Sequence, residues 1–300
     1  MLTFIVHSPD CHFQFDVTRR AASSKILLNA IFALSARHLS RTRTYDPYAS
    51  NRYHQKCLDL LIPMLRDSST MEDETLFAAT IILRVLEEID MPETNSHGHL
   101  TGIKHFVDAR DPYATGRSLS EAAFWVGLRQ EIYSALTNHQ PIQLKLEHSQ
   151  GELEPASGHI WANRAVIHCA KVMNFCFSEG GISISKWEEL NKYSKEWTEK
   201  AAFVPVTGIT SEDIHPFDDS IFPKIIYPFG YQIIGVQHHY LAQMLLEIFD
   251  PAIPRFGPRR KDLVHAMEFR VACHLKTLCG IGTYNSDTAP ALFTASMGSE

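Results

Sequence analysis

The stretch from residue 118 to residue 141 constrains the fold more than any other part of the chain. It opens with Ser118-Leu119-Ser120-Glu121, a serine and a glutamate at the spacing of a helix capping box. Apolar residues then recur at helical spacing, with a second stripe beside the first. The first stripe is Phe124, Leu128, Ile132, Ala135 and Leu136, and the second is Trp125, Arg129 and Tyr133. A helix with so wide an apolar surface packs on more than one neighbour, so we expect a central helix of a helical domain.

The helical period of apolar residues continues along most of the chain. It predicts helices over residues 22–41, 48–65, 72–89, 100–107, 160–177, 187–201, 231–249, 262–278 and 288–297. Ser185 and Glu188 form a further capping box, and Gly280 is placed just after the end of its helix. The first 20 residues carry only a weak pattern, which Pro9 interrupts. No alternating run of strand length is present, which predicts an all-α protein.

A long irregular segment, about 203–228, separates two of these helices. It contains four prolines, at positions 205, 216, 223 and 228. Apolar anchors within it predict that the segment packs on the core, since they would otherwise be exposed. These anchors are Phe217, Ile221, Phe222, Ile225 and Ile226. The expected fold is therefore a single multi-helix bundle domain over residues 1–300, with this segment as its irregular part.

Composition excludes several classes of protein. The chain has 300 residues, with 28 Lys and Arg against 34 Asp and Glu, for a net charge of −6. A mildly acidic domain without a basic stripe has no general attraction for a phosphate backbone, so we expect no direct DNA binding. No apolar run approaches the roughly 20 residues that span a bilayer, and no membrane contact is expected. The six cysteines are dispersed without a C-x-x-C pair, which indicates reduced thiols in a core.

No catalytic or cofactor-binding signature is present in the sequence. We find no G-x-S-x-G, Walker A, dinucleotide or catalytic-cysteine motif. His97 and His99, with acidic residues before them, could be assembled into a metal site. Their spacing of two directs the rings apart on a helix, so a helix-end hydrogen bond is the favoured interpretation. We therefore assign no catalytic residue, no cofactor and no metal ligand.

Three residues are candidates for a ligand pocket: Trp125, Arg129 and His238. Arg129 could pair with an acidic group of a ligand, but pairing with a buried carboxylate or stacking on Trp125 or Tyr133 is favoured. His238 falls on the apolar face of a helix, where a hydrogen-bonded core histidine is the default. The functional alternative for His238 is a general base or a pH-sensitive group.

Several segments, taken in order, resemble one known family. The segments are Ala33-Leu34-Ser35-Ala36-Arg37-His38-Leu39, Tyr53-His54, Cys57-Leu58-x-x-Leu61, Leu83-x-x-x-Glu87, His99-Leu100-x-Gly102, Phe124-Trp125, Arg129-Gln130-Glu131-Ile132-Tyr133, Trp161-x-Asn163-Arg164, the helix from Trp187 to Trp197, Phe222-Pro223 and Cys279-Gly280-Ile281. Together they resemble the regulatory middle region of fungal zinc-cluster transcription factors, in the second variety of that domain. The similarity spans nearly the whole chain, and the segment from Arg129 to Tyr133 carries most of it.

The resemblance implies an all-α regulatory domain of a nuclear protein that controls transcription, often in response to metabolites or partners. Members of that family normally carry an N-terminal DNA-binding module, in which six closely spaced cysteines hold two zinc ions. This chain has no such cysteine cluster, so the DNA-binding role transfers to none of its residues. The abrupt C-terminal end favours a truncated product with an incomplete C-terminus. A stand-alone descendant is the alternative.

Three hypotheses on function remain open from the sequence. The leading one is a fungal transcription regulator, tied to a metabolic gene cluster, whose helical body responds to a small-molecule effector or to transcriptional partner proteins. The second is a stand-alone domain reused in fungal secondary metabolism as a small-molecule binder or enzyme, in the cytoplasm rather than the nucleus. The third is an interaction module without a ligand. A homodimer is compatible with each of them.

Overall fold

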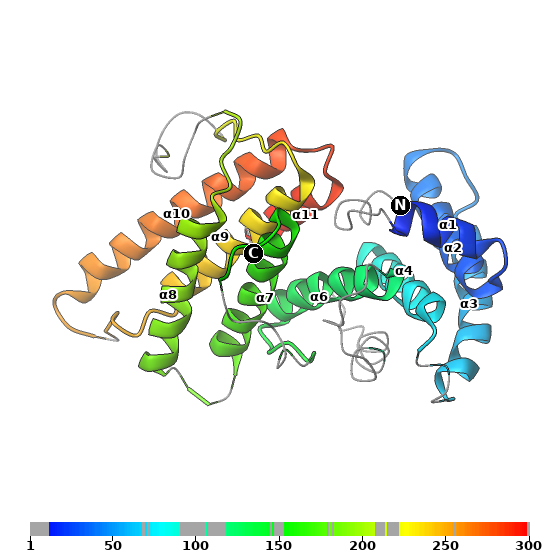
Figure 1. Ribbon diagram of the computed structural model, residues 1–300, viewed down its shortest axis with the longest axis horizontal. Coiled ribbons are helices and arrows are strands. Elements are labelled where there is room, and N and C mark those ends of the chain that lie inside the picture. Colours follow the sequence, from blue (N-terminus) through cyan, green and yellow to red (C-terminus); the bar gives the residue numbers. More distant parts are fainter. Residues whose placement is uncertain are drawn as a thin grey trace. The chain divides into compact units, whose positions relative to one another are not determined.

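The computed structural model describes residues 12–67, 70, 72–90, 106, 118–144, 146, 153–178, 180–181, 183–207, 214, 222–254 and 256–298. These residues form helices and irregular segments with no strand, which confirms the all-α prediction (Figure 1). The helices are α1 (His12–Ala21), α2 (Lys25–Thr42), α3 (Ala49–Leu65), α4 (Glu74–Asp90), α6 (Leu119–Asn138), α7 (Gly158–Phe177), α8 (Ile184–Ala201), α9 (Gly230–Ile248), α10 (Arg260–Tyr284) and α11 (Ala289–Met297). Within the described part of the chain, no helix is long and apolar enough to cross a membrane.

The chain divides into two compact units. Unit 1 takes Met1–Glu131 and Gln143–Glu147, and unit 2 takes Ile132–Ile142 and His148–Glu300. Helix α6 supplies residues to both units. The sequence prediction of a single domain over residues 1–300 stays a prediction.

Unit 1 is organised around α2, which packs against α1, α3 and α4. The helix begins at a serine cap, because Ser24 Oγ accepts a hydrogen bond from the Leu27 N–H at 3.3 Å. Ala33 is fully buried, and its small side chain lets α3 approach the α2 backbone. The Ser50 hydroxyl of α3 then donates to the Ala33 carbonyl at 2.8 Å. The alanine-rich face of α2 thus positions the helix that follows it.

Helix α1 was not predicted from the sequence, which shows only a weak pattern in the first 20 residues. Phe13, Val17 and Ala21 recur every fourth residue and are buried. They occupy one narrow stripe of a short helix whose other positions are mostly polar or charged. That stripe is too short to stand out as a period, and packing against α2 and α4 stabilises it.

The helix predicted over this stretch is present as α6, and its central place in a domain stays a prediction. Its predicted serine cap is present, since the Glu121 N–H donates to Ser118 Oγ at 3.2 Å. The Glu121 side chain does not reach back to the cap. Its Oε1 instead accepts from Trp125 Nε1 at 3.4 Å. Every residue from 123 to 132 is buried, so the helix is enclosed on all sides over this stretch.

Unit 2 is organised around α9, which packs against α7, α8, α10 and α11. Gly235 makes the crossing with α7 possible, because a Cβ at this position would lie 2.8 Å from Ala162 Cα. On another side, Gln237 Nε2 donates to the Ala291 carbonyl of α11 at 2.8 Å. A core of Trp161, Trp197, Ile233, Ile281 and their neighbours fills the space between these helices.

Two predicted helix ends are corrected. Gly280 does not end its helix, because α10 continues to Tyr284. Its missing side chain instead allows contact with the irregular segment, since a Cβ would lie 2.4 Å from the Pro223 carbonyl oxygen. The N-terminal cap of α8 is Ser183 rather than Ser185, with Ser183 Oγ accepting from the Lys186 N–H at 3.5 Å. Both serines suit a cap, so the sequence did not distinguish them.

The irregular segment is non-helical at each of its described residues, as predicted. Asn285, at the end of α10, donates to the Ile225 carbonyl at 2.7 Å and accepts from the Tyr227 N–H at 3.1 Å. Ile225 and Tyr227 are buried in the core of unit 2. Ile225 is therefore packed as predicted, whereas the predicted anchor Phe222 is exposed, as are Val204 and Val206. Phe217 and Ile221 lie outside the described residues, as do His97 and His99 and the predicted helix 100–107 apart from Phe106.

Candidate functional site

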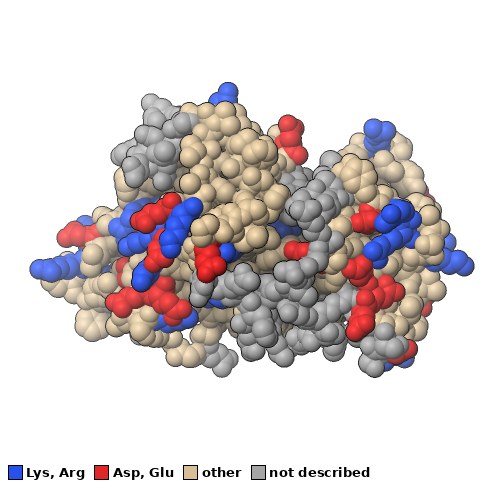
Figure 2. All heavy atoms as spheres, in the orientation of Figure 1, with Lys and Arg blue, Asp and Glu red and all other residues tan. Residues whose placement is uncertain are grey.

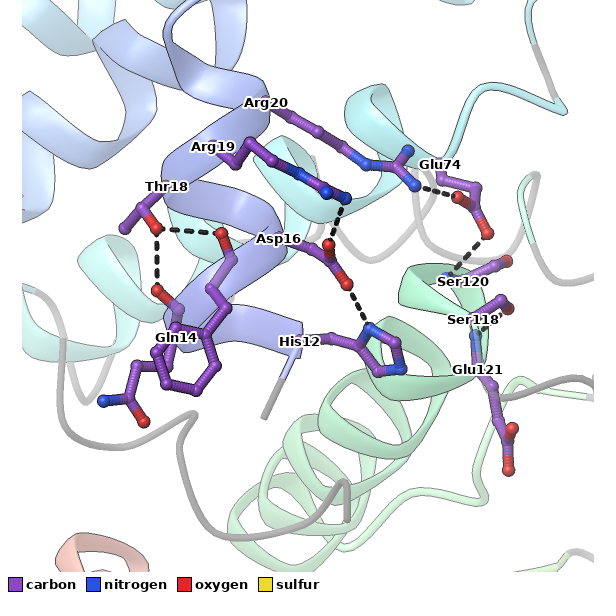
Figure 3. Close-up of polar contacts among 11 residues, drawn as sticks. His12, Gln14, Asp16, Thr18, Arg19, Arg20, Glu74, Ser118, Ser120 and Glu121 are labelled. Atoms are coloured by element: carbon purple, nitrogen blue, oxygen red, sulfur yellow. Dashed lines mark hydrogen bonds and ion pairs between the residues drawn. The ribbon is translucent and has the colours of Figure 1, made fainter. Parts of the chain in front are cut away.

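A polar network joins the start of α4 to α1 and α6 within unit 1 (Figure 3). Both carboxylate oxygens of Glu74 are engaged: Oε2 pairs with Arg20 Nη2 at 2.8 Å, and Oε1 accepts from the Ser120 N–H at 3.2 Å. On the same helix as Arg20, Asp16 Oδ1 pairs with Arg19 Nη2 at 2.6 Å. These charges satisfy one another within the protein, so the network connects three helices and offers no charge to a ligand.

A second network lies buried in unit 1 around Arg84, which is 4% exposed. Its guanidinium donates to Glu131 Oε1 at 3.0 Å, to the Gln130 carbonyl at 3.0 Å and to Glu88 Oε1 at 3.2 Å. Burial raises the pKa of Glu88 to about 7, and the positive charge of Arg84 opposes that rise. Every nitrogen of the guanidinium has an acceptor, which makes this cluster a structural ion-pair network.

Trp125 and Arg129 lie one turn apart on α6, in the part that belongs to unit 1. Arg129 is only 9% exposed, and burial lowers the pKa of its guanidinium to about 9. No carboxylate or aromatic ring among the described residues contacts its guanidinium. The favoured structural pairing for Arg129 is therefore not found in the described part of the chain. The buried arginine that meets a carboxylate is Arg84.

His238 lies on α9, in unit 2, and is fully buried. Its Nδ1 makes a 2.8 Å hydrogen bond with the Ile234 carbonyl one turn earlier. This is the arrangement of a hydrogen-bonded core histidine, the default that the sequence favoured. Trp125 and Arg129 belong to one unit and His238 to the other, so their assembly into one pocket stays a prediction.

A pocket of about 460 Å³ opens between α7 and α8 in unit 2. Its apolar wall is formed by Leu153, Ile167 and Leu190. Beside them the rings of His168 and Tyr193 stack, with centroids 4.6 Å apart and planes inclined by 26°. The volume is that of small-molecule sites, and most of the lining residues are polar or charged.

Charged residues line the rim of the same pocket, and most of them are already paired. Glu189 pairs with Lys186 at 2.8 Å, and Glu196 with Lys200 at 3.1 Å. In Figure 2, lysine and acidic side chains intermingle where α8 lies in Figure 1. Lys171 is half-buried and has no carboxylate within ion-pair distance among the described residues. Desolvation, with help from the charge of Lys186, lowers the pKa of Lys171.

The sequence analysis did not identify these pocket residues. A signal for them exists, because Arg164, His168 and Lys171 are spaced by four and then three residues, which places them on one face of α7. That signal has meaning only once α8 is known to cover the same face. Among the described residues, no group of histidine, cysteine or acidic side chains could hold a metal ion. The described cysteines, Cys57, Cys169, Cys176, Cys273 and Cys279, are free thiols, as expected.

The comparison with family models gives one match. The fungal specific transcription factor domain matches residues 1–137. Residues 1–137, which are less than half of the chain, are therefore similar to this family. Neither the comparison with curated proteins nor that with solved structures gave a match.

The fungal specific transcription factor domain covers α1 to α4 and nearly all of α6. It therefore includes the Glu74 network, the Arg84 network and the segment from Arg129 to Tyr133 on which the resemblance mainly rested. The family supports a role in transcription regulation. The match ends before α7, so the pocket lies in the part of the chain that this domain does not cover, and the resemblance of the later segments stays a prediction.

Proposed function

We propose that this chain is the regulatory body of a fungal transcription regulator that acts in the nucleus on a metabolic gene cluster. The observation that carries the proposal is the fungal specific transcription factor domain over residues 1–137. DNA contact is assigned to a zinc-cluster module outside this sequence. The chain itself supplies the response to a signal.

The mechanism that we propose is a shift of the helical body between two states when an effector or a partner protein binds one state better. The pocket between α7 and α8 supports a small-molecule effector, because it combines an apolar wall with a half-buried unpaired lysine. Transcriptional partner proteins, or a second copy of the chain in a homodimer, would bind one of the two conformational states in preference to the other.

A tethering experiment tests the regulatory role. The full chain is fused to an unrelated DNA-binding module, and a reporter gene carrying that module's site is measured in a fungal host. We expect the fusion to change reporter output relative to the module alone. Arg84→Met, which breaks the buried network of unit 1, should abolish the effect. The matched control is Arg52→Met, whose side chain is 59% exposed, and it should retain the effect. A folded fusion without any effect on the reporter would refute the role.

Direct DNA binding by this chain is expected to be absent. In a gel-shift experiment, the purified chain should give no sequence-specific complex. Non-specific phosphate binding falls steeply with salt, so a shift that survives about 0.2 M salt would contradict the proposal.

A second function deserves a test because the structure contains the α7–α8 pocket. In this alternative the chain is a stand-alone cytoplasmic protein of fungal secondary metabolism that binds, or turns over, a small molecule. Fluorescent tagging discriminates the two, since a regulator concentrates in the nucleus. An enzyme that uses Trp125, Arg129 or His238 would lose turnover of a pathway intermediate on His238→Ala while remaining folded.

A further inference from the structure

The pocket between α7 and α8 is lined by lysines and glutamates, and the charge of Glu189 partly opposes the effect of desolvation on the pKa of Lys171. Arg164, His168 and Lys171 follow one another along the face of α7 that carries pocket-lining residues. Arg164 is 7% exposed, and its Nη1 donates to the Glu154 backbone carbonyl at 2.6 Å. Its guanidinium carbon lies 4.7 Å from the Trp161 ring centroid. Among the described residues, no carboxylate lies within ion-pair distance of Arg164 or Lys171.

The glutamates that line the pocket form no ion pair with Lys171. Glu189 and Glu196 belong to α8 and are each paired with a lysine of that helix. The third carboxylate, on Glu154, is exposed and therefore solvated. Lys171 is half-buried, and desolvating an unpaired ammonium costs free energy that a bound anion would return.

We propose that this pocket binds a small monoanionic ligand with a flat apolar body, whose carboxylate or phenolate pairs with Lys171. The body would lie against Leu153, Ile167 and Leu190, beside the stacked rings of His168 and Tyr193. This inference rests on the proposed function only where it identifies the ligand as the effector of transcription regulation. Binding of the ligand to the pocket does not depend on the proposed function.

His168 contributes hydrogen bonding rather than charge. The residue is 2% exposed, its Nε2 has no hydrogen-bond partner, and burial lowers its pKa to about 3. Its ring is therefore neutral at physiological pH. Tyr193 likewise stays protonated, because burial raises its pKa to about 12. The positive charge that faces a ligand without a described ion-pair partner is then that of Lys171, and it suits one anionic group.

The test uses three probes that share one apolar body: 2-naphthoate, the neutral 2-naphthamide and the cationic 2-naphthylmethylammonium. Binding to the full chain is measured by isothermal titration calorimetry at pH 7. We expect 2-naphthoate to bind at least about tenfold more tightly than the amide, since a charge-assisted hydrogen bond to a lysine is lost in the amide. The cation should bind more weakly than the amide.

Two variants locate the site. Lys171→Met should weaken 2-naphthoate at least about tenfold and leave 2-naphthamide unchanged. Lys195→Met, an exposed lysine of α8 outside the pocket wall, should leave both probes unchanged. Lys171→Glu should reverse the order of the anionic and cationic probes. Circular dichroism and the melting temperature of each variant establish that it is folded.

Three results would overturn the inference: no binding of 2-naphthoate up to millimolar concentration, equal affinity for acid and amide, or equal effects of Lys171→Met and Lys195→Met. These failures are distinct from failure of the regulatory role. A tethered chain that controls the reporter but binds no probe retains the proposed function and loses the anion site. A chain that binds 2-naphthoate as expected but leaves the reporter unchanged retains the anion site and loses the proposed function.

Discussion

Arg84 and Glu131, 47 positions apart in the chain, form an ion pair of 3.0 Å inside unit 1, with side chains 5% and 3% exposed. The pair ties α4 to α6 at the segment that carries the family resemblance. Arg84 also contacts the Gln130 carbonyl and Glu88, so the pair belongs to a network of one guanidinium and two carboxyl groups.

Breaking this pair from one side is expected to destabilise the protein strongly. Glu131→Gln leaves the buried guanidinium with reduced compensation and should lower the free energy of unfolding by about 3 kcal/mol. Urea denaturation followed by circular dichroism measures the change. The double variant Arg84→Met with Glu131→Gln should cost less than the sum of the two single variants. The control is Lys186→Ala, which breaks an exposed pair and should cost under about 1 kcal/mol. Equal costs for the buried and the exposed pair would contradict the network.

A side chain at Gly280 is expected to force α10 away from the irregular segment. In Gly280→Ala, the new Cβ would meet the Pro223 carbonyl oxygen at 2.4 Å and Pro223 Cγ at 2.9 Å. We expect a loss of about 1–3 kcal/mol in the free energy of unfolding, although alanine is the better helix former. Gly180→Ala is the control, since nothing lies within 4 Å of a Cβ there. Stabilisation by Gly280→Ala would show that this contact is not close in solution.

Buried histidines of unit 2 are expected to make stability depend on pH. Burial, with smaller contributions from His168 and His274, lowers the pKa of His239 to about 3 in the folded protein. The unfolded chain takes up that proton near pH 6.5, so the contribution of His239 is present above pH 6.5 and is lost as pH falls toward 3. Between pH 7 and pH 5 this loss is about 2 kcal/mol for one such histidine.

The variant His239→Gln isolates this effect. The difference in the free energy of unfolding between pH 7 and pH 5, measured in urea, should shrink by about 2 kcal/mol relative to the unaltered chain. His265→Gln, at an exposed position of α10, serves as the control and should leave the difference unchanged. An unchanged difference in His239→Gln would mean that His239 is accessible to protons when folded.

Removing the carboxylate of Glu74 is expected to loosen the start of α6. In Glu74→Gln, the charge opposite Arg20 is lost, while a side-chain oxygen remains to accept from the Ser120 N–H. Glu74→Ala removes both contacts. We expect hydrogen exchange in the first turn of α6 to accelerate clearly in Glu74→Ala and little in Glu74→Gln. Equal acceleration would assign the effect to the ion pair rather than to the backbone contact.

Local patterns were sufficient wherever a helix carries a wide apolar face or a side-chain cap. The α6 stretch was predicted from such a pattern, and its Ser118 cap is present. Helix α1 was missed because Phe13, Val17 and Ala21 make a stripe of only three residues. Gly280 was misplaced for a different reason: glycine suits a helix end, but here it serves close packing on Pro223, a residue far away in the chain.

In the candidate site, too, local patterns identified some residues, whereas their partners depended on tertiary packing. Arg129 was singled out from its neighbours, yet among the described residues the buried arginine seen to pair with a carboxylate is Arg84. Which of two arginines meets Glu131 depends on how α4 packs against α6, and no local spacing records that. The pocket at Lys171 was likewise out of reach, because α8 supplies its opposite wall.

The sequence by itself determined the helical class, most helix positions and the family similarity of the first 137 residues, because period, caps and composition act within a few residues of each other. Tertiary structure alone decided which charges were neutralised and which, as at Lys171, lie beside a cavity without an ion-pair partner among the described residues. The physical reason is that desolvation and ion pairing depend on groups brought together from distant parts of the chain.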